Sequence, residues 1–334
     1  MSLVTVIIPA YNEEKYICKC LESVVHQNFA DYDVMVVNDG SSDNTENIIK
    51  EYKNEYSFIN YFNKENGGLS SARNYGIDRL KDSKYVVFLD SDDYLDSEYL
   101  CNLVASAEEK QSDVVCSGQY RITEDGKIIS HVRYILDGQG KCVLRHLNMH
   151  GKIYRVDYLK KYNLRFPEGK TYEDNPFNLA AFFLTDRINF LQYEGYYQLV
   201  HLDSITTCKI KQNEVPYSEL EQSVQCVIAH GTNDYDVFEY TLMSFFTYFI
   251  LEANRKHRYY KLAGRKSDTK MLDELCDFAR RILEKYCPSY MHNPYLSVLK
   301  KSDIEIKQKV AVAVFMRMVH WNYAKGFVKL FYKL

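Results

Sequence analysis

The 334-residue sequence lacks several features that would assign a protein to a class at once. It contains neither a G-x-G-x-x-G nor a G-x-x-x-x-G-K-[ST] motif, which disfavours a dinucleotide oxidoreductase and an ordinary P-loop NTPase. It has no basic excess, because its formal net charge is −3, and we therefore expect no nucleic-acid binding. No apolar run approaches the ~20 residues of a membrane span. The start "MSLVTVIIPAYNEE" enters a strand without the basic region of a signal peptide, so we expect a cytosolic protein, attached to a membrane surface at most.

The cysteines also exclude two kinds of site. There are nine, an odd number, and none of them forms a C-x-x-C pair. Cys18 and Cys20 are two positions apart, so a helix would point them away from each other. We interpret the cysteines as reduced thiols rather than as a disulfide framework or a zinc site.

Alternation of strand and helix patterns is the main feature of the first two thirds of the chain. Short β-branched or aromatic runs are separated by amphipathic helical patterns; the runs are 3–8, 32–39, 58–62, 85–89 and 113–119. This order predicts an α/β fold with a mostly parallel sheet and helices on both faces. Beyond about residue 215 the apolar spacing is helical, in 219–230, 236–254 and 271–286. We therefore predict two domains, 1–212 and 213–334.

Polar residues gather where the predicted strands end. They form three groups, Pro9-Ala10-Tyr11-Asn12-Glu13, Asn38-Asp39-Gly40-Ser41 and Asp90-Ser91-Asp92-Asp93. In open α/β sheets ligands bind beyond the carboxyl ends of the strands, so the three groups should line one crevice. Carboxylates one residue apart suit Mg²⁺ or Mn²⁺ on a substrate phosphate. The alternative is that one Asp caps the next helix and the others are solvated.

Four segments carry a resemblance to a known family: "VTVIIPAYNEEKYICKCLESVVHQ", "VMVVNDGSSDNT", "NKENGGLSSARNYGI" and "YVVFLDSDDYL". They resemble, in order and spacing over residues 1–205, the family 2 glycosyltransferases, and most closely bacterial enzymes of capsule, O-antigen and teichoic-acid synthesis. The resemblance implies the Rossmann-like GT-A fold and inverting transfer of a sugar from a nucleotide diphosphate sugar. It would place the enzyme in the cytoplasm or on the inner face of the cytoplasmic membrane.

The resemblance also implies where the nucleotide binds. Pro9, Ala10 and Tyr11 would wrap the nucleoside, with Glu13 close by. Asp39 would accept a hydrogen bond from the base, which favours uracil because its N3 carries a proton. The base and diphosphate would be reached from the loop by Asn66, Gly67 and Arg73. Alternatively, Gly67-Gly68 is only a turn before a helix, and Arg73 is only a surface ion pair.

The same resemblance implies roles for two of the three neighbouring aspartates. A UDP group and a divalent cation, Mn²⁺ or Mg²⁺, would lie over Asp90, Ser91 and Asp92. Asp92 would ligate the metal, and Asp90 would lie near the ribose or a metal-bound water. The metal would offset the clustered negative charge. Asp93 has no assigned role.

A second carboxylate pair stands in "GKTYEDNPFNLAAFF". Asn175-Pro176 predicts an N-cap followed by proline at the first helical position, with Glu173 and Asp174 just before the helix, where its dipole favours their ionised form. Such a pair is often structural. In the family, however, an Asp of this motif is the general base, and we assign that role to Asp174 with Glu173 as the alternative.

Two further residues are weaker candidates. "YYQLVHLDSIT" resembles a family segment in which arginines are common where Leu199 and His201 stand here. His201 could contact the diphosphate or the metal, or be a structural histidine. Lys152 in "GKIYR" is a candidate near the acceptor.

These assignments predict an inverting, metal-dependent glycosyltransferase that moves a hexosyl or N-acetylhexosaminyl group from a UDP-sugar to a glycan or lipid-linked acceptor. The alternative is an inactive nucleotide-sugar-binding partner subunit, against which the presence of Asp90, Asp92 and Asp174 together argues. A nucleotidyltransferase is disfavoured because no Gly-rich phosphate loop follows the first strand.

The segment 309–334 has no acidic residue and shows helical amphipathicity. Its apolar side would comprise Val312, Met316, Val319, Tyr323, Phe327, Leu330 and Phe331, and its basic side Lys325, Lys329 and Lys333, with Arg317 at the flank. We predict a helix that binds either an anionic membrane surface or the domain or a second subunit, as in a homo-oligomer.

Overall fold

The computed structural model describes residues 2–80, 82–134, 136, 147–201, 215–232, 234–262 and 270–333, with side chains described except at 255–262, 329 and 331–333. The chain divides into two compact units, one of residues 1–135 and 148–208 and the other of 136–147 and 209–334. The assignment of 1–212 to donor binding and catalysis and of 213–334 to acceptor, membrane or oligomer contacts stays a prediction.

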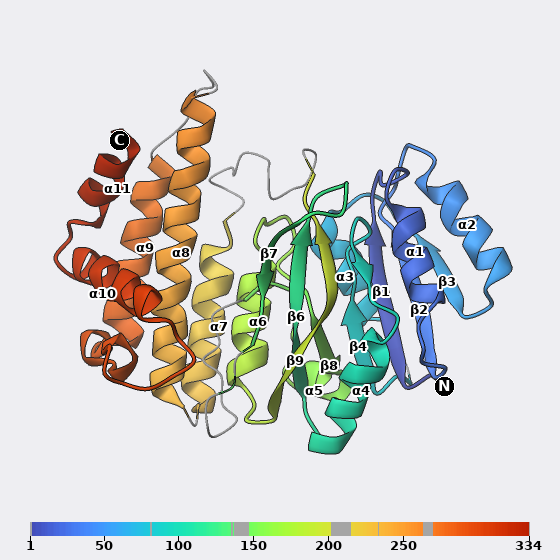
Figure 1. Cartoon of the computed structure of the whole chain (residues 1–334), viewed down its shortest axis with the longest axis horizontal. Coiled ribbons are helices and arrows are strands. Elements are labelled where there is room, and N and C mark those ends of the chain that lie inside the picture. Colours follow the sequence, from blue (N-terminus) through green and yellow to red (C-terminus); the bar gives the residue numbers. More distant parts are fainter. Residues whose placement is uncertain are drawn as a thin grey trace. The chain divides into compact units, whose positions relative to one another are not determined.

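The first unit is built on one mixed sheet, which has nine strands among the described residues (Figure 1). The order is β3-β2-β1-β4-β8-β6-β9-β5, with β7 paired to β6. The strands are β1 (Val4–Ala10), β2 (Tyr32–Asn38), β3 (Ile59–Asn63), β4 (Tyr85–Phe88), β5 (Tyr94–Leu95), β6 (Val114–Ile122), β7 (Ile128–Val132), β8 (Lys152–Arg155) and β9 (Ile188–Leu199). The helices of this unit are α1 (Ile17–Val25), α2 (Thr45–Glu55), α3 (Leu69–Ile77), α4 (Tyr99–Lys110), α5 (Val156–Lys161) and α6 (Asp174–Phe183).

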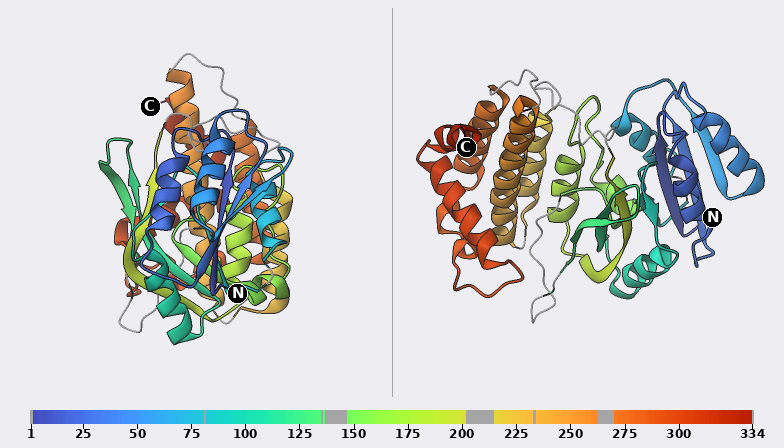
Figure 2. Two further views of the ribbon diagram at one scale, coloured as in Figure 1. Left: turned by 90° about the vertical axis from the view of Figure 1, so that its right-hand side faces the viewer. Right: turned by 45° about the horizontal axis from the view of Figure 1, so that its top comes forward.

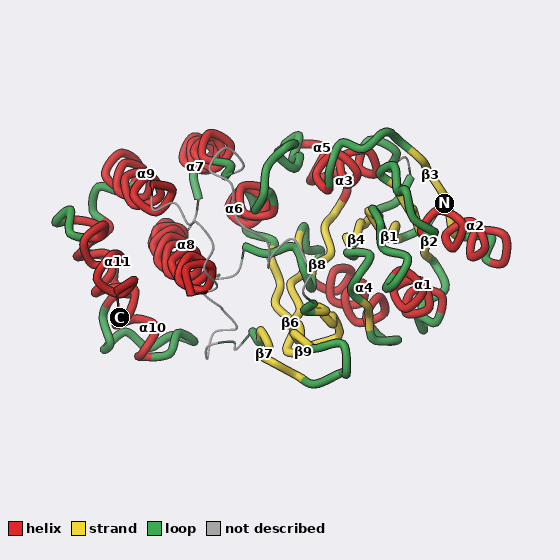
Figure 3. The backbone as a smooth tube through the Cα atoms, turned by 90° about the horizontal axis from the view of Figure 1, so that it is seen from above, coloured by secondary structure: helices red, strands yellow, loops and turns green. Residues whose placement is uncertain are grey.

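Helices cover both faces of this sheet, which confirms the predicted α/β class. In the view along the sheet, α1 and α4 lie on one face and α3 and α5 on the other (Figure 3). Alternate β1 residues Val4, Val6 and Ile8 belong to the same buried cluster as the apolar face of α1. On the other face α3 approaches closely, because a Cβ at Gly76 would lie 2.8 Å from Cγ2 of Ile7.

The direction of the strands is the part of the sheet that sequence periodicity did not predict. Strands β3, β2, β1 and β4 are parallel, as expected. Strand β8 is antiparallel to both β4 and β6, so the rest of the sheet is mixed. Val87 of β4 stands opposite Ile153 of β8. Continuing this antiparallel register brings the residues just before β8 beside the residues just after β4.

The second unit is helical, as predicted. Its helices are α7 (Tyr217–His230), α8 (Tyr235–Leu262), α9 (Lys270–Tyr286), α10 (Ile306–His320) and α11 (Ala324–Lys333), with short 3-10 turns η3 (Tyr290–His292) and η4 (Pro294–Leu296). Helices α8 and α9, in orange shades in Figure 2, pack side by side. None of the helices in the described parts of the chain combines the length and the apolarity needed to cross a bilayer.

The prediction of one continuous amphipathic helix over 309–334 is wrong. Helix α10 ends at His320 and α11 begins at Ala324, and Asn322 between them has a left-handed φ of 61°. Val312, Met316 and Val319, predicted to form its apolar face, are buried in the second unit, whereas Tyr323 and Leu330 are exposed. The side chains of the predicted members Lys329, Phe331 and Lys333 lie outside the described residues.

The close approach of Gly151 to the neighbouring strand β6 leads to a testable prediction. Gly151 has a φ of 72°, and a Cβ there would lie 2.5 Å from the backbone oxygen of Ser117. We expect Gly151→Ala to lower the free energy of unfolding by about 1–3 kcal/mol more than a glycine substitution without a clash, because the backbone must shift. Urea denaturation of both variants measures the difference.

Gly126→Ala is the matched control for this substitution. Gly126 also has a positive φ, 82°, but a Cβ there meets no atom within 4 Å, so only the left-handed backbone cost of about 1–2 kcal/mol applies. Equal destabilisation by the two substitutions would show that the contact with Ser117 does not constrain the fold.

Candidate active site

Two loops at the ends of β1 and β2 are tied together by hydrogen bonds. The backbone nitrogen of Glu13 donates to Oγ1 of Thr45 at 2.7 Å, and that of Asn12, at φ 54°, donates to Oγ of Ser41 at 3.0 Å. Pro9 and Ala10 are buried within β1, whereas Tyr11 is 49% exposed. Of the three residues predicted to wrap the nucleoside, Tyr11 is thus the one with an accessible ring.

The carboxylate of Asp39 fixes the loop that follows β3. It accepts hydrogen bonds from the backbone nitrogens of Gly67 at 3.0 Å and Gly68 at 2.7 Å, and from Nζ of Lys64 at 2.6 Å. The structure therefore brings Asp39 together with the Asn66-Gly67 segment, both of which the family resemblance assigned to the nucleotide site. Its contact with a base stays a prediction.

Arg73 connects the two carboxylate motifs of the sequence. Its Nη2 donates to Oδ1 of Asp90 at 2.5 Å and its Nη1 to Oε1 of Glu173 at 2.7 Å. The side chain is only 2% exposed, so it is not the surface ion pair considered as an alternative. Arg73 lies on α3, Asp90 follows β4 and Glu173 precedes α6. Three segments that are far apart in sequence thus meet at one guanidinium.

This guanidinium sets the charge state of Asp90. Burial would raise the pKa of that carboxyl, but Arg73, followed by His150, holds it well below its usual range. For Arg73, burial acts to lower the pKa, while Asp90 and Glu173 raise it further above its ordinary value. Both groups are therefore ionised at neutral pH.

Asp92, the second aspartate of the D-x-D, pairs with His201. The Nε2 atom of His201 lies 3.0 Å from Oδ2 of Asp92, and its ring lies 4.5 Å from that of Tyr16. Ser91 is buried between the two aspartates, whereas the Asp92 side chain is 20% exposed. The structure thus brings His201 to the D-x-D, while its contact with a metal or diphosphate stays a prediction.

Asp93, which had no role from sequence, attaches the D-x-D turn to the sheet. Its Oδ2 accepts from the hydroxyl of Tyr196 and its Oδ1 from the backbone nitrogen of Leu199, both at 2.8 Å. Both partners lie on β9. Burial, together with the charges of Asp92 and Asp90, raises the pKa of Asp93 well above its usual range.

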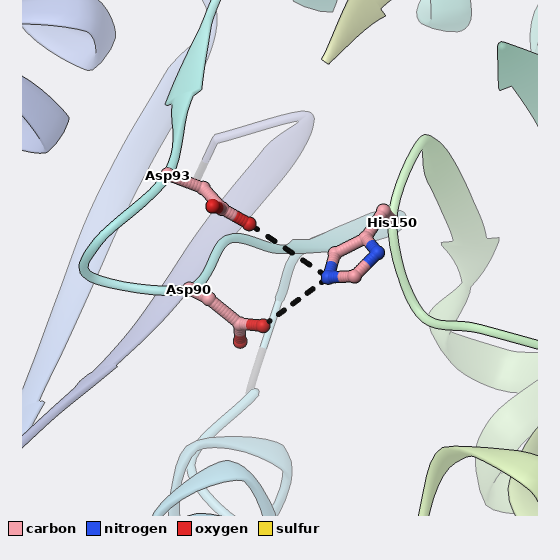
Figure 4. A group of neighbouring side chains, drawn as sticks. All are labelled: Asp90, Asp93 and His150. Atoms are coloured by element: carbon pink, nitrogen blue, oxygen red, sulfur yellow. Dashed lines mark ion pairs between the residues drawn. The ribbon is translucent and has the colours of Figure 1, made fainter. Parts of the chain in front are cut away.

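His150 is a site residue that sequence reasoning missed. Its Nε2 lies 3.5 Å from Oδ2 of Asp90 and 3.7 Å from Oδ2 of Asp93 (Figure 4). It stands opposite Asp90 because β8 runs antiparallel to β4. The signal in the sequence was weak: a histidine before the glycine of "HGKIYR". The adjoining Lys152 is buried and donates to Oδ1 of Asn148 at 3.1 Å, and burial lowers its pKa to about 8.

The second carboxylate pair lies at the start of α6, because this helix begins two residues earlier than predicted. Helix α6 begins at Asp174, with Glu173 rather than Asn175 at the cap position. The helix dipole was expected to favour ionisation of both acids. Burial, followed by the charge of Glu173, instead raises the pKa of Asp174 to about 7. A carboxyl group with this pKa can take up a proton near neutral pH.

Glu13, in the loop after β1, is a third acid with a raised pKa. Burial, followed by the charge of Asp92, raises the pKa of Glu13 to about 7. Asp43 and Asp90 add to this effect, while His201 opposes it. The edge of the sheet around the D-x-D therefore carries an excess of negative charge that a cation would offset.

Comparisons with known proteins place these features in a family. The family model for glycosyl transferase family 2 matches residues 5–171. The uncharacterized glycosyltransferase EpsJ of Bacillus subtilis (strain 168) is 31% identical over 245 residues, which are 68% of this chain and 69% of EpsJ. Glycosyltransferase GlyA of Streptococcus pneumoniae serotype 4 is 30% identical over 61% of this chain. The chain spans only about a third of GlyA, because the match covers 31% of that protein.

TarS of Staphylococcus aureus, a poly(ribitol-phosphate) beta-N-acetylglucosaminyltransferase, is similar in sequence and in structure. Its strain MW2 sequence is 31% identical over 58% of this chain and 35% of TarS. The match with the crystal structure of TarS 1–349 covers all of this chain and 92% of the TarS chain, with a TM-score of 0.69 at 20% identity. The same fragment has been solved with UDP and with UDP-GlcNAc, and those structures match with TM-scores of 0.69 and 0.65. This likeness confirms the predicted GT-A fold.

The family model covers half of the chain, and the match with EpsJ extends over more than two thirds of both proteins. The D-x-D turn and the Glu173-Asp174 pair, which the family resemblance put at one site, are linked through Arg73. On these grounds the chain belongs to glycosyl transferase family 2.

Proposed function

We propose that this chain is an inverting, metal-dependent glycosyltransferase that moves a sugar from a UDP-sugar to a hydroxyl group of a glycan or lipid-linked acceptor in bacterial surface polysaccharide synthesis. The observation that carries the proposal is the buried Arg73 bridge, which holds the D-x-D turn and the start of α6 together. The aspartates of the D-x-D turn can then bind the donor while Asp174, at the start of α6, faces the acceptor. The UDP and UDP-GlcNAc complexes of TarS support the choice of donor.

The nucleotide would bind at the ends of β1 and β2. Tyr11 offers its exposed ring for stacking on uracil, and Pro9 and Ala10 would contribute through their backbone because their side chains are buried. Asp39 holds Gly67 beside it and would accept from N3 of the base at the same edge. Asn66 would complete the base pocket, and Arg73 would act on the diphosphate by orienting Asp90.

A divalent cation fits the chemistry of the D-x-D turn. Hard carboxylate oxygens of Asp92 and Asp90 are the donors that Mg²⁺ and Mn²⁺ prefer on a substrate diphosphate. The charge of Asp92 contributes, after burial, to the raised pKa of Glu13, and a cation bound there would offset that charge. Bound there, the cation would supply a Lewis acid that stabilises charge on the departing diphosphate.

A second grouping of possible ligands lies beside the first. Donor atoms of Asp90, Asp93 and His150 lie within 4.8 Å of one another. Both carboxylate oxygens of Asp93 already accept hydrogen bonds from β9, however, and its side chain is buried. We therefore assign the cation to Asp92 and Asp90, with His150 holding Asp90 in place.

Asp174 would act as the general base of the transfer. It would remove the proton from the acceptor hydroxyl as that oxygen forms a bond to the anomeric carbon. The bond from that carbon to the β-phosphate oxygen breaks at the same time, and UDP leaves with the electron pair, so the configuration is inverted. Glu173 is the weaker choice because Arg73 binds one of its oxygens. Lys152 and His201 would assist near the acceptor and the diphosphate.

An inactive nucleotide-sugar-binding partner subunit is the alternative. Such a protein would need the nucleotide site but would have no use for a carboxyl group with a pKa of about 7 beside it. Release of UDP from UDP-GlcNAc, with water or a glycan as acceptor, distinguishes the two.

Metal dependence of UDP binding tests the cation site. We expect UDP to bind more tightly with Mn²⁺ than with EDTA in isothermal calorimetry, and Asp92→Asn to abolish the difference. The reason is that Asp92 would supply the ligand that joins the cation to the protein. Electron paramagnetic resonance of Mn²⁺ measures the same loss without turnover.

Two matched variants sharpen this experiment. Asp82→Asn removes an exposed acid of the same unit and should leave the metal effect unchanged. His150→Gln should weaken Mn²⁺ binding less than Asp92→Asn does. If His150→Gln abolishes Mn²⁺ binding and Asp92→Asn does not, the cation belongs to Asp90, Asp93 and His150 instead.

The pH dependence of UDP release tests the base. Asp174 works only when deprotonated, so the rate should fall as the pH drops through about 7. Asp174→Asn should remove this limb and lower the rate about 10²–10⁴-fold, which is typical for loss of a general base. UDP affinity should stay close to that of the parent protein, because the group faces the acceptor.

Glu173→Gln is the comparison variant for the base. It keeps the size of the side chain but weakens the bond to Arg73. A near-normal rate in Asp174→Asn, together with a lost pH limb in Glu173→Gln, would transfer the role to Glu173.

A further inference from the structure

Exposed apolar side chains of the described residues are concentrated in one stretch of the second unit. Of 14 exposed large hydrophobic residues, eight lie between positions 298 and 330. They are Val298, Leu299, Ile306, Val310, Val314, Trp321, Tyr323 and Leu330. Contiguous apolar surface on a folded unit marks a site of interaction with another surface.

Helix α10 carries a continuous part of this surface. Ile306, Val310 and Val314 are four residues apart and therefore lie on one side of the helix, where they are 64%, 46% and 40% exposed. Trp321, two turns beyond Val314 and directly after the helix, extends the row and is 56% exposed. We call these four residues the outer row.

The outer row is separate from the packing face of the helix. Val312, Phe315, Met316 and Val319 are buried and attach α10 to the second unit. A helix at the surface of a globular unit needs only one apolar side, so the outer row is not required for folding of the unit. Its four large side chains remain in contact with solvent.

Charge around the outer row is mainly positive. Residues 306–334 contain six Lys and Arg and no Asp or Glu, in a chain with a net charge of −3. Lys307, Arg317 and His320 of α10 are exposed. Glu305, just before the helix, pairs with Lys307 at 2.8 Å. The surface is thus apolar in the middle and basic at its edges.

This combination of apolar and basic side chains favours one of two possible partners for the outer row, a second copy of the chain or a lipid bilayer. A second copy pairing through the same face would bring Lys307, Arg317 and His320 of both copies to one seam, where the adjacent acid, Glu305, already pairs with Lys307 of its own copy. An anionic bilayer instead provides phosphates for the basic edge and an interfacial layer that accommodates Trp and Tyr. We propose that the outer row of α10 binds the surface of an anionic lipid bilayer. The proposal does not depend on the donor or on the catalytic assignments.

Trp321 gives this proposal a direct readout, because it is the single tryptophan of the chain. The full chain is mixed with vesicles of phosphatidylcholine and phosphatidylglycerol in equal parts, or of phosphatidylcholine alone. With the anionic vesicles we expect sedimentation of the protein and a blue shift of tryptophan emission, both reversed by high salt. Neutral vesicles should bind about tenfold more weakly, because the basic edge then has no partner.

Substitutions identify the surface. Val310→Glu with Val314→Glu should lower partitioning onto anionic vesicles about tenfold or more, since two charges would enter the interface. Arg317→Gln should reduce the preference for phosphatidylglycerol. Ile129→Glu on β7 is the matched control, because Ile129 is 49% exposed and lies in the first unit. Release of UDP from UDP-GlcNAc without vesicles should be the same in all three variants, which separates this proposal from the proposed function.

Three results would overturn the proposal. One is unchanged emission and no sedimentation with anionic vesicles. Another is equal binding to both kinds of vesicle, which would show that the basic edge contributes nothing. The third is a doubled mass in analytical ultracentrifugation that Val310→Glu with Val314→Glu abolishes, without any effect of lipid, which would make the outer row a contact between two copies.

Discussion

The buried guanidinium of Arg73 is the interaction on which the rest of the site depends. It joins a helix, a strand end and the start of another helix through Asp90 and Glu173, and its side chain is almost fully enclosed. Desolvating these charges is costly, and removing one partner of a buried ion pair typically costs about 3–5 kcal/mol. Without Arg73 both carboxylates would lose the guanidinium that they share. The polar link between the D-x-D turn and the start of α6 therefore depends on this one side chain.

The same cation explains why neighbouring acids have different protonation. Asp90 contacts Arg73 directly, and its pKa lies well below the usual range. At Asp174, burial and then the charge of Glu173 raise the pKa to about 7. When their environments move the pKa values of nearby carboxyl groups apart, one group can stay a fixed anion while another accepts a proton at the same pH. A donor site and a base can thus be built from the same residue type.

Local patterns predicted the parts of this protein that local chemistry determines. The β-branched runs, the alternation with helices and the acids after the strand of Phe88 were visible in the sequence, and the structure has them. His150 was missed because its place depends on β8 pairing antiparallel with a strand more than 60 residues away, which no periodicity reports. The burial of Arg73 and the attachment of Asp93 to β9 are likewise long-range. In the C-terminal segment, periodicity found the apolar residues of α10 but could not tell the buried row from the exposed one.

The aspartates of "FLDSDDYL" show how repulsion between like charges is accommodated. Asp90 is neutralised by Arg73 and approached by His150. Both oxygens of Asp93 accept hydrogen bonds from β9, and burial raises the pKa of this carboxyl well above its usual range. Asp92 pairs with His201, and one fifth of its side chain remains accessible. Three identical side chains within four positions therefore have three different sets of partners: a guanidinium, the sheet and a histidine. The side chains of Asp90 and Asp92 are 22% and 20% exposed, whereas that of Asp93 is 2% exposed, so Asp90 and Asp92 are the two aspartates placed to receive a cation brought in with a diphosphate.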